Sequence, residues 1–168
     1  MRTLPLIAAA CLVALTTAHA IGWELRTGAD QHSGRSYAVV GQRAMNQDAF
    51  LALECQPSGF LVGVGTNVPF PMHQVIDDQK SEFRIKTAKP IVVTLSPEPT
   101  SNGALNFTTR RNPQFARRIA QYLSENSGDI VVNVDGAPTL VFEDADRTEK
   151  MEAWARVCQL GGMRARKR

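Results

Sequence analysis

The stretch AFLALECQPSGFLVGVGT, residues 49–66, decides the fold. Apolar residues alternate with other residues on both sides of a Pro-Ser-Gly turn, so this stretch predicts a hairpin of two antiparallel strands. Gly63 and Gly65 lie within its second strand and predict a bulge or a close backbone approach, since no phosphate-loop lysine follows them. One face of the hairpin is predicted to carry Leu51, Leu53, Cys55, Phe60, Val62 and Val64.

The first 20 residues have the layout of a secretory signal peptide. Arg2 precedes an apolar run, residues 6–15, and Ala18-His19-Ala20 matches the A-x-A cleavage pattern. The run is too short for a comfortable membrane span. We therefore expect a mature chain that begins at Ile21, carries no later transmembrane segment, and is periplasmic in a Gram-negative envelope or secreted.

Two cysteines remain once the predicted signal peptide, which holds Cys11, is removed. In an oxidising compartment they predict one disulfide, Cys55–Cys158. It would close a loop of about 100 residues and stabilise the fold by up to about 4–5 kcal/mol in the chain-entropy model. The sequence has no C-x-x-C motif and no histidine cluster beside either thiol, which argues against a redox or metal role.

The rest of the chain predicts short strands followed by two helices in the C-terminal half. Residues 67–79 and 97–103, rich in proline and polar residues, predict a long connection and a turn. The further strands are expected at residues 21–26, 37–42, 83–86, 91–95, 104–109, 129–134 and 139–142, with a hairpin turn at Asp135-Gly136.

Each predicted helix has a start signal and an apolar stripe. Asn112 and Pro113 begin the first helix, and Gly128 ends it. Asp146 and Glu149 give the second a start that resembles a capping box. The stripes are Phe115, Ile119, Tyr122 and Leu123 in the first helix, and Met151, Trp154, Ala155 and Cys158 in the second.

These elements predict a mainly β, α+β fold in one domain, residues 21–160. We expect an antiparallel β-sandwich-like domain with two helices in its C-terminal half, the second joined to the sheet by the disulfide. Residues 161–168 are expected to form a basic flexible tail. Trp23 and Trp154 lie in phase with apolar stripes, so we assign both to the core.

The charged residues exclude some classes of function. The 168 residues carry a formal net charge of +3. Arg110, Arg111, Arg117 and Arg118 flank the first helix, but export and the absence of interleaved aromatic residues argue against nucleic acid. The acidic cluster Glu143, Asp144 and Asp146 lacks the ligand spacing of a calcium loop and suits a helix N-terminus instead.

No residue pattern indicates catalysis, a metal or a cofactor. The predicted mature chain has two histidines, His32 and His73, and neither lies in a recognisable catalytic motif. A hydrolase that uses His73 with Asp77 or Asp78 stays open, because the three share one long loop. As candidate partner-binding residues we single out His73, Asp77, Asp78, Arg117 and Arg118.

The order of elements resembles a family of exported proteins. An early tryptophan strand, the hairpin LALECQPSGFLVGVG, and the C-terminal segments FARRIAQYL, DIVVNVDGAPTLVFE and AWARVC occur in sequence. This order is similar to that of the small periplasmic proteins of the invasion-associated locus B type and the related type VI secretion-associated periplasmic proteins. That family usually has a glycine soon after the phenylalanine, whereas here Glu143-Asp144-Ala145-Asp146 follow it. The matching positions are Trp23, Cys55, Phe142, Ala153 and Cys158.

The resemblance implies a non-enzymatic envelope protein that acts through contacts. We accordingly expect a binding or accessory protein of the cell envelope, with an envelope or secretion-machinery protein as its partner. An inhibitor of a lytic enzyme or protease is the alternative, and the hydrolase with His73 is the third hypothesis.

Overall fold

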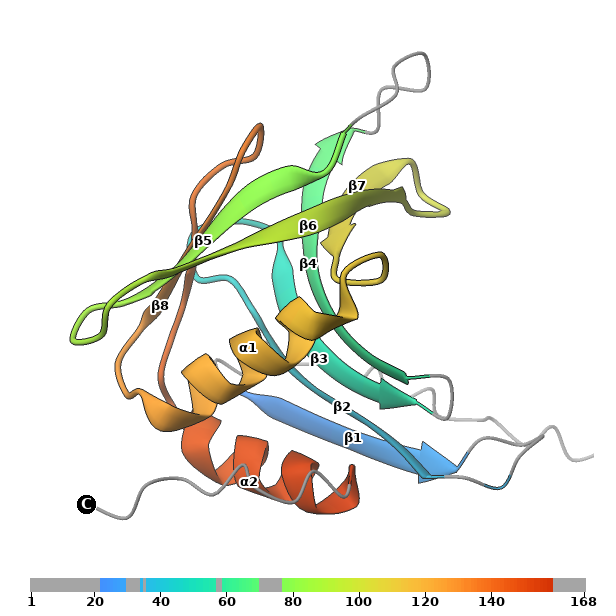
Figure 1. The fold of residues 1–168 in the computed structure, drawn as a ribbon, viewed down its shortest axis with the longest axis vertical. Coiled ribbons are helices and arrows are strands. Elements are labelled where there is room, and N and C mark those ends of the chain that lie inside the picture. The colour runs from blue at the N-terminus through green and yellow to red at the C-terminus, as the bar shows by residue number, and fades with distance from the viewer. Residues whose placement is uncertain (1–21, 30–33, 35, 57–58, 70–76, 159–168) are drawn as a thin grey trace, which may run out of the picture.

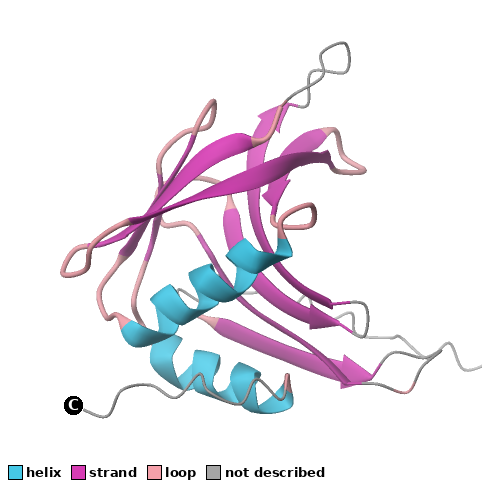
Figure 2. Cartoon of the chain, in the orientation of Figure 1, coloured by secondary structure: helices cyan, strands magenta, loops and turns pink. Residues whose placement is uncertain are grey.

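The computed structural model describes residues 22–29, 34, 36–56, 59–69 and 77–158, which form nine strands and two helices (Figures 1 and 2). The strands are β1 (Glu24–Ala29), β2 (Ser36–Arg43), β3 (Phe50–Gln56), β4 (Gly59–Pro69), β5 (Gln79–Ile85), β6 (Ile91–Pro99), β7 (Ala104–Thr108), β8 (Ile130–Val134) and β9 (Leu140–Phe142). The helices are α1 (Pro113–Glu125) and α2 (Arg147–Val157).

All nine strands belong to one antiparallel sheet, in the order β1-β2-β3-β4-β7-β6-β5-β8-β9. The sheet curls, so that in the view of Figure 1 β5 and β6 run across the upper part of the molecule and β1–β3 across its lower part, with α1 between them and α2 at the bottom. The predicted class is confirmed: the chain is mainly β and antiparallel, with two helices in its C-terminal half. The sandwich-like arrangement is made by the curl of one continuous sheet.

Strand β6 joins the two halves of the sheet. Its first part, Ile91 to Leu95, pairs with β5, and its second part, Ser96 to Pro99, pairs with β7. The expected turn at residues 97–103 is therefore wrong in its first half, because Pro97 and Pro99 lie in a strand. Over these residues only β7 pairs with β6 among the described strands, and a strand paired on one side accommodates prolines whose missing N–H faces the other side.

The hairpin of residues 49–66 has the predicted faces. Leu51 and Leu53 on β3 pair with Val64 and Val62 on β4, and all four are fully buried. Strand β4 runs on to Pro69, so the predicted connection at residues 67–79 begins later than expected. The register shifts between Gly65 and Pro69, which confirms the predicted irregularity at the end of this strand.

Helix α1 packs against β4 and β6 along its apolar face. Ile119 and Leu123 are buried, and the Tyr122 hydroxyl accepts a hydrogen bond from the Ile85 N–H at 2.9 Å. Asn112 is the N-cap residue, but its side chain makes no capping hydrogen bond, and its amide nitrogen donates to the Asp78 carboxylate at 3.3 Å. The predicted helix start is thus confirmed and the predicted side-chain cap is wrong.

Helix α2 packs against β1 and β2. Met151 and Trp154 are buried as predicted, and the Trp154 indole N–H donates to the Ala38 carbonyl at 3.2 Å. The capping box is wrong, because Asp146 adopts a left-handed backbone (φ 59°) and its side chain makes no cap hydrogen bond. The first tryptophan is buried too, and the Trp23 indole N–H donates to the Glu143 carbonyl at 2.9 Å.

The edge of β9 is covered by the connection between β2 and β3. The Val141 N–H donates to the Asn46 side-chain oxygen at 3.0 Å, and the Met45 N–H donates to the Val141 carbonyl at 2.8 Å. The Asn46 amide also donates to the Thr139 carbonyl at 2.8 Å. Because exposed edges pair with other chains, these bonds protect the edge of β9, and they also tie it to the β2–β3 connection across the curl of the sheet.

Several predicted features lie outside the described residues. They are the signal peptide at residues 1–20, His32, His73 and the basic tail at residues 161–168. Neither described helix is long and apolar enough to cross a bilayer.

Candidate functional site

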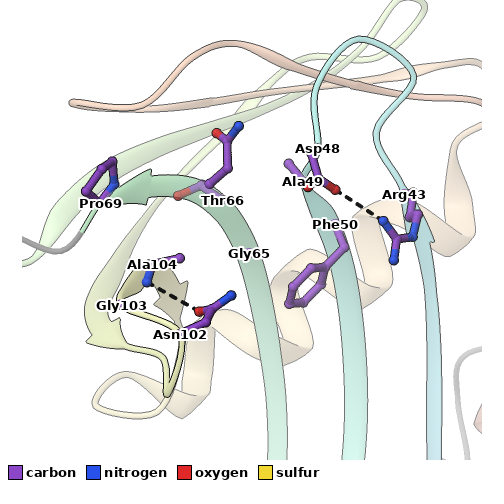
Figure 3. A pocket seen from close by; sticks show the side chains of 11 residues that line it. Arg43, Asp48, Ala49, Phe50, Gly65, Thr66, Pro69, Asn102, Gly103 and Ala104 are labelled. Carbon is purple, nitrogen blue, oxygen red and sulfur yellow. Dashed lines mark hydrogen bonds and ion pairs between the residues drawn. The ribbon is translucent and has the colours of Figure 1, made fainter.

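An open pocket lies where β3 begins, β4 ends and the turn between β6 and β7 comes alongside (Figure 3). Its volume is about 610 Å³, which is within the usual range for sites that bind small ligands. We refer to it as the Phe50 pocket. It is lined by Arg43, Asp48, Ala49, Phe50, Gly65, Thr66, Asn67, Pro69, Asn102, Gly103 and Ala104.

Phe50 forms an apolar surface in the pocket. It points to the outer face of β3, opposite the buried Leu51, and remains 43% exposed. Its partner across the strands is Gly65, where a Cβ atom would overlap the Phe50 ring. One side of the ring is therefore packed on the β4 backbone, and glycine is required beneath it.

The turn between β6 and β7 contributes an oriented amide. The Asn102 side-chain oxygen accepts hydrogen bonds from the Thr100 hydroxyl and from the Ala104 N–H, the latter at 3.3 Å. This pairing leaves the amide N–H groups without a partner among the described residues. In Figure 3 the amide nitrogen faces across the pocket towards Phe50.

Two charged side chains lie on the rim of the pocket, and they pair with each other. The Arg43 guanidinium contacts the Asp48 carboxylate at 3.1 Å, with 68% and 78% of the two side chains exposed. The other lining residues are uncharged. The pocket therefore carries no net charge, and its polar groups are amides, a hydroxyl and backbone.

Strand alternation contained a signal for Phe50. Because Leu51, Leu53 and Cys55 alternate to the buried face, the residues between them point outward. An aromatic residue in that outward phase indicates an exposed ring. The partnership with Asn102 had no such signal, because the two residues are far apart in the sequence.

The candidate partner-binding residues are distributed over two places. Asp78 meets the start of α1, where it accepts from Arg111 at 3.5 Å and from Asn112 at 3.3 Å. Arg117 and Arg118 are exposed on α1 and form no ion pair within the described part of the chain. Asp77 is exposed and its carbonyl accepts from Gln79 at 2.6 Å. With His73 outside the described residues, partner binding and the hydrolase hypothesis stay predictions.

The acidic cluster around residue 144 has a structural partner that the sequence did not reveal. Arg147 is fully buried at the start of α2, and its guanidinium contacts the Asp144 carboxylate at 2.7 Å. It also donates to the carbonyls of Gly128 at 3.0 Å and Asn126 at 2.5 Å. Burial lowers the pKa of Arg147, and the charge of Asp144 opposes this shift. These bonds hold the segment after α1 against the start of α2.

Within the described residues, no group of three or more histidine, cysteine or acidic side chains is placed to hold a metal ion. The two cysteines are bonded to each other, with their Cα atoms 5.9 Å apart. Cys158 is the residue that follows the last turn of α2, so the predicted link between sheet and helix is confirmed.

Comparisons with protein-family models, with curated proteins and with solved structures give no match to this chain.

Proposed function

We propose that the chain is an exported, non-enzymatic binding or accessory protein of the cell envelope. The disulfide between Cys55 and Cys158 is the observation that carries this proposal. Disulfides persist in oxidising compartments and are rare in the cytosol. This one joins residues 103 positions apart and ties the β3–β4 hairpin to the end of α2, which supports a chain that folds in an oxidising compartment.

The composition of the Phe50 pocket supports binding. Its two ionisable side chains, Arg43 and Asp48, neutralise each other, and its remaining polar groups are suited to hydrogen bonding. The resemblance in residue order to periplasmic accessory proteins supports the same role. A partner protein of the envelope or of a secretion machine is the expected contact.

In-cell cross-linking of the tagged full-length chain, followed by mass spectrometry, tests the proposal. We expect one recurrent envelope or secretion-machinery protein to be captured. A chain without residues 2–20 is the matched control, because it should stay in the reducing cytosol and capture none of that partner. Alkylation without reduction should find no free thiol in the exported protein. Two free thiols, or the same capture by both chains, would contradict the proposal.

A further inference from the structure

The Phe50 ring is held ready for a ligand. Its underside lies on Gly65, and the rest of the side chain is open to the pocket. Single exposed rings are common on protein surfaces, and Phe50 is singled out because its exposed face lines a pocket. An aromatic face carries partial negative charge, and it attracts weakly polarised C–H groups that lie flat against it.

The amide of Asn102 faces the same space with a fixed orientation. Its oxygen is held by Thr100 and Ala104, so what it offers to the pocket is N–H donors. The turn itself is closed by the Thr100 hydroxyl, which accepts from the Ala104 N–H at 3.0 Å, and by the Thr100 N–H, which donates to the Ala104 carbonyl at 2.9 Å. A donor that needs no reorganisation favours binding of a ligand rich in oxygen acceptors.

The charge of the pocket selects among such ligands. Arg43 and Asp48 cancel, and no other lining residue is charged. A phosphate, a nucleic acid or an acidic lipid headgroup would find no excess positive charge here, although these ligands depend on it. The occupant expected from the charges is neutral.

We propose that the Phe50 pocket binds a neutral oligosaccharide, with a pyranose ring stacked on Phe50 and its hydroxyl groups hydrogen-bonded to Asn102. A pyranose presents C–H groups on one face and hydroxyls around its edge, which is the combination that an aromatic platform and a nearby amide donor recognise. This inference rests on the proposed function, because it names the ligand class of that binding protein.

A proline-rich peptide is the competing neutral occupant, since it also docks on aromatic rings. Peptide-binding surfaces of that class use several aromatic side chains side by side. The Phe50 pocket has one aromatic residue in its lining, and its other side chains are mainly small or amide-bearing. The structure therefore favours the saccharide.

Isothermal titration of the oxidised, purified protein with chitotetraose, cellotetraose and maltotetraose tests the proposal, with a proline-rich decapeptide as the competing probe. We expect at least one saccharide to bind. Phe50→Ala should weaken that binding at least tenfold, and Asn102→Ala several-fold. Binding of the peptide alone, or of no probe, would overturn the proposal.

Tyr37 provides the matched control. It is 37% exposed on the same face of the sheet and covers Gly28 as Phe50 covers Gly65, but it does not line the pocket. Tyr37→Ala should leave saccharide affinity within twofold of the parent protein. Equal losses in both variants would show that the loss of affinity is not specific to the ring in the pocket, and the assignment to the pocket would be wrong.

The outcomes separate this inference from the proposed function. A captured envelope partner without saccharide binding would leave the proposed function standing and remove the ligand class. Saccharide binding by a chain that is not exported would support the ligand class and contradict the proposed function.

Discussion

The two ends of strand β3 are built in opposite ways. At its C-terminal end Cys55 is bonded to Cys158, and Trp154 packs beneath the same hairpin with its ring 5.1 Å from Phe60. At its N-terminal end Phe50 is exposed over Gly65 beside an open pocket. One hairpin thus provides both the cross-link of the fold and its most evident binding surface.

The difference extends into the neighbouring elements. On the side of the disulfide, both ends of α2 are bonded to other segments: Arg147 makes these bonds at its start, and Cys158 makes them after its last turn. On the pocket side, Gln42 is buried opposite Leu51, and neither polar atom of its side chain has a partner among the described residues. The comparison teaches that the covalent and ionic links lie on one side, whereas at the pocket end a whole buried amide, that of Gln42, lacks hydrogen-bond partners among the described residues. Substitutions at each end can test it.

Removal of the disulfide should have the largest effect. Cys55→Ser with Cys158→Ser frees a loop of 103 residues and should lower the free energy of unfolding by about 2–5 kcal/mol. Urea unfolding followed by tryptophan fluorescence measures the change. Reduction of the parent protein is the control and should give a similar loss. An unchanged urea midpoint in both samples would mean that the disulfide does not stabilise the C-terminal end of β3.

Arg147→Met should have the second-largest effect. Methionine keeps the unbranched apolar stem but is shorter than arginine, and it leaves the carbonyls of Asn126 and Gly128 and the carboxylate of Asp144 without their donor. Because Asp144 retains some contact with solvent, we expect a loss of about 2–3 kcal/mol, below that of a fully buried pair. Arg156→Met, an exposed change on the same helix, should alter stability by less than about 0.5 kcal/mol. Equal effects would contradict a special role for the start of α2.

Gln42→Met should change stability in the opposite direction. Replacing a buried amide that lacks partners with an apolar side chain of similar size should raise the free energy of unfolding by about 1 kcal/mol. Thermal unfolding measures the gain. Ala49, also buried at the pocket end, serves for comparison, because enlarging it with Ala49→Val should not stabilise. A loss of stability in Gln42→Met would show that burial of the Gln42 amide does not destabilise the pocket end.

Two glycines on β4 should give the smallest and most local difference. At Gly65 a Cβ would overlap the Phe50 ring, whereas at Gly63 nothing lies within 4 Å of an added Cβ. Gly65→Val should therefore cost about 1 kcal/mol and displace Phe50, and Gly63→Val should be neutral or slightly stabilising. Chemical denaturation measures both variants. If the two behave alike, the Phe50 platform does not depend on its glycine.

Hydrophobic periodicity in the sequence predicted the buried faces of the hairpin and of α2. The alternation in residues 49–66 identified the buried face of the hairpin, and the spacing of Met151, Trp154 and Cys158 identified the packed face of α2. The disulfide followed from the count of cysteines. Both side-chain caps were predicted wrongly: the Asn112 amide contacts Asp78, which precedes β5, and Asp146 has a left-handed backbone.

By itself the sequence determined the class of the fold, the pair of cysteines and the buried sides of the hairpin and of the two helices, because these follow from hydrophobic period and composition. Tertiary structure alone decided that β6 crosses from β5 to β7, that Arg147 closes the start of α2, and that Asn102 comes to face Phe50. Each of these depends on groups brought together by the curl of the sheet. Contacts between distant segments depend on how strands pair in space, which no local pattern specifies.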